Sequence, residues 1–155
     1  MRARVPLPLL FALLAAALAA CGSAGAASPA PASGGSIAVR DAWIRAATEG
    51  GLSAAYLTIA NGSPADDALV AISAPELATV VGLHETTTGD DGMTGMHHTP
   101  SIAIPANGSL TLEPGGFHVM LEGLRRDLVA GDTVQLVLIF ERAGPVTVDA
   151  QVRAG

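Results

Sequence analysis

The protein has 155 residues, enough for one folded domain, and an acidic formal net charge of −6. Its basic residues are all arginines, and an acidic chain without lysine has little attraction for a phosphate backbone, which argues against nucleic-acid binding. A single cysteine excludes a disulfide within the chain.

The N-terminus has the pattern of a secretory signal peptide over residues 1–20. Arg2 and Arg4 precede an apolar run over residues 7–20 that is too short for an ordinary membrane-spanning helix. The run ends in Leu-Ala-Ala before Cys21, which resembles a bacterial lipobox and implies cleavage and lipid attachment at Cys21. The alternative is a plain signal peptide with an incidental cysteine. We therefore expect an extracytoplasmic, membrane-anchored bacterial lipoprotein.

A short linker separates the expected anchor from the folded part. Residues 21–35 consist, after the cysteine, of Gly, Ala, Ser and Pro without periodicity, a composition typical of a flexible tether. The folded domain is expected over residues 36–155. Its net charge, with that of the tether, is −8, because 6 arginines and 14 acidic residues follow the signal peptide. Lipid, rather than surface charge, should hold the protein at an anionic membrane.

The domain reads as short strands between turn residues. Alternation is clear near the C-terminus, where Val146, Val148 and Val152 share one strand face. Only residues 73–78 suggest a helical turn. The expected strands cover residues 36–45, 53–61, 68–73, 78–85, 109–114, 117–124, 132–141 and 145–153. This pattern predicts an all-β antiparallel sandwich or barrel.

Histidine and methionine are concentrated in one part of the domain. After the signal peptide, all of them lie between positions 84 and 120; they are His84, Met93, Met96, His97, His98, His118 and Met120. Methionines that only fill a core would be spread along the chain. The clustering therefore indicates a site.

The segment Phe117 to Leu121 suggests how part of this site is arranged. On a strand, Phe117, Val119 and Leu121 would face the core, while His118 and Met120 would lie side by side on the outer face. Each of these two could alone be a solvated side chain. Together, and with His84 ending another expected strand, they favour a pair of metal ligands. Thioether ligands select Cu(I). A blue-copper centre would need a cysteine thiolate, and the one cysteine is expected to carry lipid, so a blue-copper centre is excluded.

The spacing of these residues resembles that of the periplasmic PCuAC copper chaperones. Their signature is a histidine, ten residues, a methionine, 21 residues and His-x-Met. Here 21 residues separate Met96 from His118, whereas His84 and Met96 are separated by 11, one more than in the family. The extra residue falls in the acidic stretch over residues 86–92. This leaves Met93 as an alternative ligand to Met96. The spacing of 21 residues to His118 favours Met96.

The resemblance extends over nearly the whole domain, including residues 41–46, 54–61 and 104–121. It implies a cupredoxin-like β-sandwich with one exposed Cu(I) site bound by His84, Met96, His118 and Met120. It also implies delivery of copper to the dinuclear copper centre of cytochrome oxidase, with oxidase subunit II and Sco-type proteins as transfer partners. The alternative function is a copper-buffering or resistance lipoprotein without a dedicated acceptor.

The remaining candidates have weaker support from the sequence. Met93, His97 and His98 are possible auxiliary metal ligands; His97 and His98 could hold a second ion, Cu(II), or be solvated loop histidines. Trp43 and Tyr56 lie in apolar runs and are expected to pack in the core. No H-E-x-x-H, G-x-S-x-G, P-loop or dinucleotide motif is present, so we expect a protein that is not an enzyme.

Overall fold

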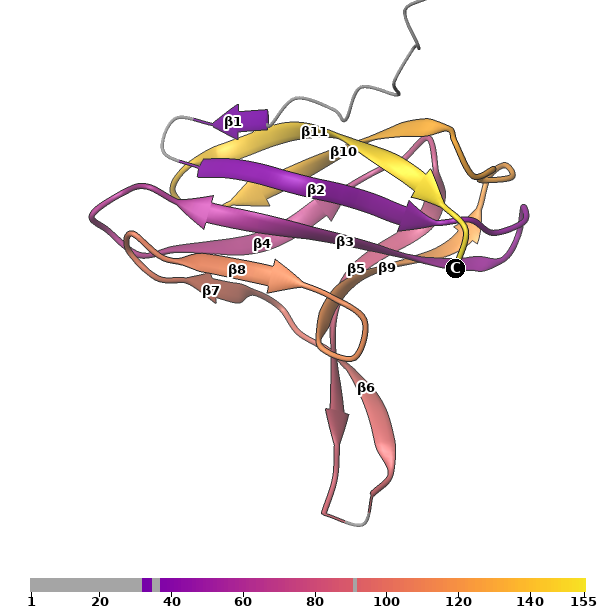
Figure 1. The fold of residues 1–155 in the computed structure, drawn as a ribbon, viewed down its shortest axis with the longest axis horizontal. Helices are drawn as coiled ribbons and strands as arrows, with labels where there is room; N and C mark the ends of the chain where they lie inside the picture. Colours follow the sequence, from indigo (N-terminus) through magenta and orange to yellow (C-terminus); the bar gives the residue numbers. More distant parts are fainter. Residues whose placement is uncertain (1–31, 35–36, 91) are drawn as a thin grey trace, which may run out of the picture.

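The computed structural model describes residues 32–34, 37–90 and 92–155, and almost all of the regular structure there is β-strand (Figure 1). The expected signal peptide, Cys21 and most of the expected tether lie outside the described residues. Within the described residues, no helix is both long and apolar enough to cross a membrane.

Eleven strands form one continuous sheet that bends over itself into a sandwich. They are β1 (Ala32–Gly34), β2 (Ile37–Arg45), β3 (Leu52–Asn61), β4 (Asp67–Ser73), β5 (Ala78–Thr88), β6 (Thr94–His98), β7 (Ile102–Ile104), β8 (Ser109–Leu112), β9 (Phe117–Leu124), β10 (Thr133–Phe140) and β11 (Gly144–Arg153). The strand order is β6-β5-β9-β3-β2-β11-β10-β4-β7, with β1 beside β2 and β8 beside β3. All pairs are antiparallel except β2 with β11. The predicted all-β sandwich is confirmed.

The core lies between the two halves of the sheet and follows the alternation of the strands. On β9, Val119 and Leu121 are fully buried, and on β10, Leu136 and Leu138 are fully buried. Along β11, buried apolar residues alternate with more exposed residues, as the sequence predicted. The core fixes which face of each strand points outward, and this positions the candidate site.

The structure differs from the sequence-based expectation in several strands. β5 continues to Thr88 and pairs with β6, so residues 86–88 of the acidic stretch are part of a β-hairpin that projects from the body of the sandwich (Figure 1). β6 was not predicted because its Gly, Met and His residues have no strand-like apolar alternation. Three residues of the expected tether, Ala32–Gly34, pair with β2 as strand β1. The expected helical turn is present as a single turn between β4 and β5, where Leu77 N and Ala78 N both donate to the Ala74 carbonyl.

Trp43 is half-buried and lies outside the main core, which corrects the sequence-based expectation for this residue. Tyr56 is buried, as expected, and its ring lies against that of Trp43, with ring centroids 4.5 Å apart. Arg153 covers the Trp43 ring at 5.6 Å from its centroid.

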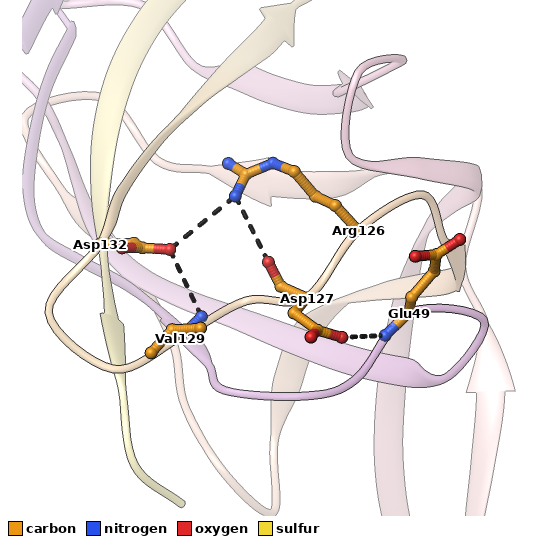
Figure 2. A network of polar contacts seen from close by, with 5 residues as sticks. All are labelled: Glu49, Arg126, Asp127, Val129 and Asp132. Atoms are coloured by element: carbon orange, nitrogen blue, oxygen red, sulfur yellow. Dashed lines mark hydrogen bonds and ion pairs between the residues drawn. The ribbon is translucent and has the colours of Figure 1, made fainter.

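A polar network ties together the loops at one end of the sandwich (Figure 2). The Glu49 amide, in the β2–β3 loop, donates to Asp127 Oδ1 in the β9–β10 loop at 2.8 Å. Arg126 forms an ion pair with Asp132 at 3.8 Å and donates to the Asp127 carbonyl at 3.3 Å. Both charged side chains of the ion pair are about half exposed, so the network positions loops and adds little stability.

Candidate metal centre

Three histidines lie in one row across three neighbouring strands. His84 on β5 is paired with His98 on β6 and with His118 on β9. Directly paired residues of antiparallel strands point to the same face, so all three imidazoles emerge on the outer face. The His84 ring centroid lies 5.7 Å from that of His98 and 5.9 Å from that of His118.

The two candidate methionine ligands share this face. Met120 pairs with Gly82, and Met96 pairs with Thr86, so each lies two residues along the strand from the histidine row. Met96, Met120 and His118 line one pocket of about 310 Å³, together with Tyr56 and Arg45. The fold therefore brings all four predicted ligands to one region of the outer face. Met96 is 55% exposed, so it is accessible from solvent.

His118 points outward as predicted but is buried, with 5% of its surface exposed. Its neighbours on the same face, including His84 and the Pro114–Gly115 turn, cover it. The His118 ring donates from Nδ1 to the Gly116 carbonyl at 3.0 Å, since a carbonyl can only accept. This hydrogen bond fixes the tautomer of His118 and leaves the lone pair of its Nε2 atom available to bind a metal ion.

His84 occupies the centre of the row, between the other two imidazoles. Burial lowers the pKa of His84, and the positive charges that His118 and His98 can carry lower it further, while Glu122 opposes the shift. The neutral imidazole is the form that binds a metal ion. The buried Nδ1 atom of His84 has no hydrogen-bond partner among the described residues. A buried nitrogen of this kind costs free energy unless a ligand engages it.

Gly82 provides the space that the histidine rings occupy. A Cβ atom at this position would lie 3.3 Å from Nε2 of His84 and 3.5 Å from Cδ2 of His98. The first distance is tighter than an ordinary van der Waals contact, so the ring would have to shift. Sequence reasoning did not select Gly82, because a glycine within an apolar strand has no signal of its own for this role.

The side chains present suit a soft metal better than a hard one. Among the described residues, no group of three His, Cys, Asp or Glu side chains is placed to hold a metal ion by itself. The thioethers of Met96 and Met120 lie beside the imidazoles, and thioether with imidazole is a donor set that favours Cu(I). The unpartnered Nδ1 of His84 and the oriented ring of His118 are suited to bind such a metal ion.

The three auxiliary ligand candidates, Met93, His97 and His98, do not lie together on one face of the hairpin. His98 belongs to the histidine row, whereas His97 pairs with Glu85 and points to the opposite face of the hairpin. Met93 precedes β6, is 72% exposed, and its carbonyl accepts a hydrogen bond from the Gly89 amide at the hairpin tip. Only Met96 and His98 among the hairpin candidates therefore face the same side as His84.

Sequence comparison relates nearly the whole domain to proteins described as putative lipoproteins. Residues 37–152 match the family model described as "Putative lipoprotein LpqE-like". A relative from Leifsonia xyli subsp. xyli (strain CTCB07), "Putative lipoprotein Lxx21020", is 33% identical over 121 residues, which cover 77% of this chain and 72% of the relative.

Solved structures with the same fold bear on the chemistry of such domains. The copper-bound PCuAC domain from PmoF2 is 27% identical, with a TM-score of 0.68 over 81% of this chain and 99% of that one. The solution structure of CuI-DR1885 from Deinococcus radiodurans is 36% identical, with a TM-score of 0.58 over 76% of this chain and 79% of that one. The likeness to PCuAC domains agrees with the cupredoxin-like sandwich predicted from the sequence.

Proposed function

From the premise that this chain belongs to the LpqE-like family, of the PCuAC copper chaperone type, we propose that it binds Cu(I) reversibly and passes it to another protein. The proposed ligands are His84, Met96, His118 and Met120. Two relatives of known structure are named as copper-bound and CuI-bound forms, which supports copper as the cargo of this fold. We propose no enzymatic reaction.

The observation that carries this proposal is the common face of imidazoles and thioethers over β6, β5 and β9. The oriented His118 ring and the unpartnered Nδ1 of His84 supply nitrogen donors, and Met96 and Met120 supply sulfur donors. Thioethers need no deprotonation, so copper would be retained at mildly acidic pH better than at a thiolate site.

The exposure of Met96 suits transfer rather than storage. A ligand that is 55% exposed at the edge strand of a sheet can be replaced by a donor atom of an approaching protein without unfolding the core. His118 is buried and hydrogen-bonded, so it would keep its position during the exchange. Copper would therefore leave from the hairpin side of the site.

We propose that lipid attachment at Cys21 holds the protein at the outer face of a bacterial membrane, and the lipoprotein relatives support this anchor. The proposed acceptor is the dinuclear copper centre of cytochrome oxidase subunit II, with Sco-type proteins as co-workers. The alternative is a copper-buffering or resistance lipoprotein without a dedicated acceptor.

A transfer experiment separates these alternatives. The purified protein is loaded with one equivalent of Cu(I) and mixed with the copper-free soluble domain of oxidase subunit II, with and without a Sco-type protein. A chaperone should lose its copper to that acceptor faster than a small-molecule Cu(I) complex of equal affinity does. A rate no faster than that of the small-molecule complex would favour buffering. A protein that takes up no Cu(I) would contradict both functions.

A further inference from the structure

We propose that His98 is a further copper ligand, which joins His84 and His118 to hold Cu(II) where Met96 would serve Cu(I). This inference rests on the proposed copper-binding function and adds a second oxidation state to the same site. It gives the hairpin two alternative ligands on one face, a thioether and an imidazole.

The strand register favours His98 as a neighbour of His84. His98 is the direct cross-strand partner of His84, whereas Met96 pairs with Thr86 and is only a diagonal neighbour. Directly opposed Cβ atoms lie about 4.5–5.5 Å apart, and diagonal ones about 7–8 Å. His98 is therefore closer in the sheet to the central ligand than the methionine on the same strand.

The rings lie near enough to converge on a shared ion after they turn. Two imidazoles that bind one metal ion at about 90–110° to each other, through bonds of about 2.0–2.1 Å, have ring centres roughly 4.5–5 Å apart. The observed separations from His84 are 5.7 Å to His98 and 5.9 Å to His118. The described side chains do not yet form a three-ligand group, so the rings must turn toward a common point on binding. His98 is exposed on the edge strand, where such a rotation disturbs no core contact.

The donor atoms fit the proposed change of oxidation state. Imidazole nitrogen suits Cu(II) in a tetragonal arrangement, whereas thioether sulfur favours Cu(I). Gly82 leaves room for the His84 ring beside His98, because a Cβ there would crowd His84 Nε2 at 3.3 Å and contact His98 Cδ2 at 3.5 Å. His97, next in the chain, points away from this face and offers a control of the same chemistry.

The test compares His98→Ala with His97→Ala in the purified protein. Cu(II) and Cu(I) affinities are measured by competition titration with a chelator for each oxidation state, and the Cu(II) forms are examined by electron paramagnetic resonance. Loss of a partner that merely orients a ligand costs about 10–100-fold in metal affinity, so loss of a direct ligand should weaken Cu(II) binding at least tenfold.

We expect His98→Ala to weaken Cu(II) binding by that amount and to remove one nitrogen coupling, while Cu(I) affinity stays nearly the same. His97→Ala should change neither. If His98→Ala leaves the Cu(II) spectrum and affinity as in His97→Ala, or lowers both affinities equally, the proposal is overturned. Wild-type Cu(I) titration tests the proposed function separately: absence of Cu(I) binding would reject that function, whereas an absent His98 effect with intact Cu(I) binding rejects only the Cu(II) ligand.

Discussion

At the scale of single residues, the site depends on a missing side chain as much as on its ligands. Gly82 lies two residues before His84 on the same strand, and its lack of a Cβ leaves the space that the His84 ring uses. Glycine within a strand lowers stability, because it loses more conformational freedom than alanine and packs no side chain. The protein thus retains a locally unfavourable residue at the position where the rings need room.

Gly82→Ala should therefore separate stability from metal binding. We expect the copper-free protein to gain about 0.5–1 kcal/mol of unfolding free energy, since alanine is favoured over glycine in a strand. Cu(I) affinity should fall by about tenfold, or 1.4 kcal/mol, because the added methyl group displaces the His84 ring. Chemical denaturation and Cu(I) competition titration measure the two effects. An unchanged affinity would show that the ring has room to move aside.

Alternation on β9 provides a second residue-scale test. Val119 is fully buried in the core, whereas Met120 is half-buried on the outer face. Val119→Ala should cost about 1–3 kcal/mol of stability by opening a cavity, with little change in Cu(I) affinity of the folded protein. Met120→Ala should do the reverse. Thermal melting of the two copper-free variants compares their losses of stability. Equal destabilisation by both substitutions would identify Met120 as a structural residue.

Unlike Met120, His118 is a candidate ligand whose replacement should also destabilise the copper-free protein. The strand pattern predicted its direction correctly, but its neighbours bury it and Gly116 accepts its hydrogen bond. Replacement by alanine removes a hydrogen bond worth about 0.5–1.5 kcal/mol as well as a metal ligand. Loss of copper in that variant therefore needs a stability measurement beside it.

At the scale of elements, the β5–β6 hairpin is the part of the fold that makes the site. It carries His84 on one strand and Met96 with His98 on the other, and it projects from the sandwich body (Figure 1). In a hairpin, a shift of register by one residue moves every side chain of a strand to the other face. The pairing of Thr88 with Thr94 places Met96 and His98 on the face of His84.

This register predicts which hairpin methionine matters. Met96→Leu should lower Cu(I) affinity much more than Met93→Leu, because leucine roughly preserves volume while removing sulfur. Met93 lies outside β6, near the hairpin tip, and serves as the matched control. Cu(I) competition titrations on both variants measure the difference. A larger loss for Met93→Leu would mean that the metal-bound hairpin adopts another register.

At the scale of the whole molecule, one buried carboxylate connects distant parts of the sandwich. Asp67, at the start of β4, is 7% exposed and accepts hydrogen bonds from the amides of Arg142 and Ala143 in the β10–β11 turn, at 2.9 and 3.0 Å. Burial tends to raise the pKa of Asp67, but the backbone hydrogen bonds, including one from Ala68, outweigh it and lower the pKa below its ordinary value.

The lowered pKa gives stability a defined pH dependence. Because the folded-state pKa of Asp67 lies below the unfolded value of about 3.9, its contribution is full above that pH and is lost as the pH falls through the folded-state value. Asp67→Asn should reduce stability at neutral pH by about 1.5–3 kcal/mol, the contribution of hydrogen bonds to a charged group. Denaturation of both proteins at pH 7 and at acidic pH measures this. The difference should shrink on acidification, and a pH-independent difference would assign the loss to packing alone.

The sequence by itself determined the all-β class, eight of the strands and the set of candidate ligands. Alternation in segments such as residues 145–153 is a local property, since buried and exposed faces are written in neighbouring residues. The clustering of histidine and methionine is likewise visible in the chain, because these residue types are scarce elsewhere in it.

Which of the clustered residues share a face depends on how the strands pair. β6 has no apolar alternation, so its existence and register come from pairing with β5 and not from local preference. That pairing separated His98 from its neighbour His97 and gave Gly82 its role. The pairing of β2 with β3 likewise placed Trp43 beside Tyr56 and outside the main core. The physical reason is that a side chain's surroundings depend on the strands beside it, which lie far away in the sequence.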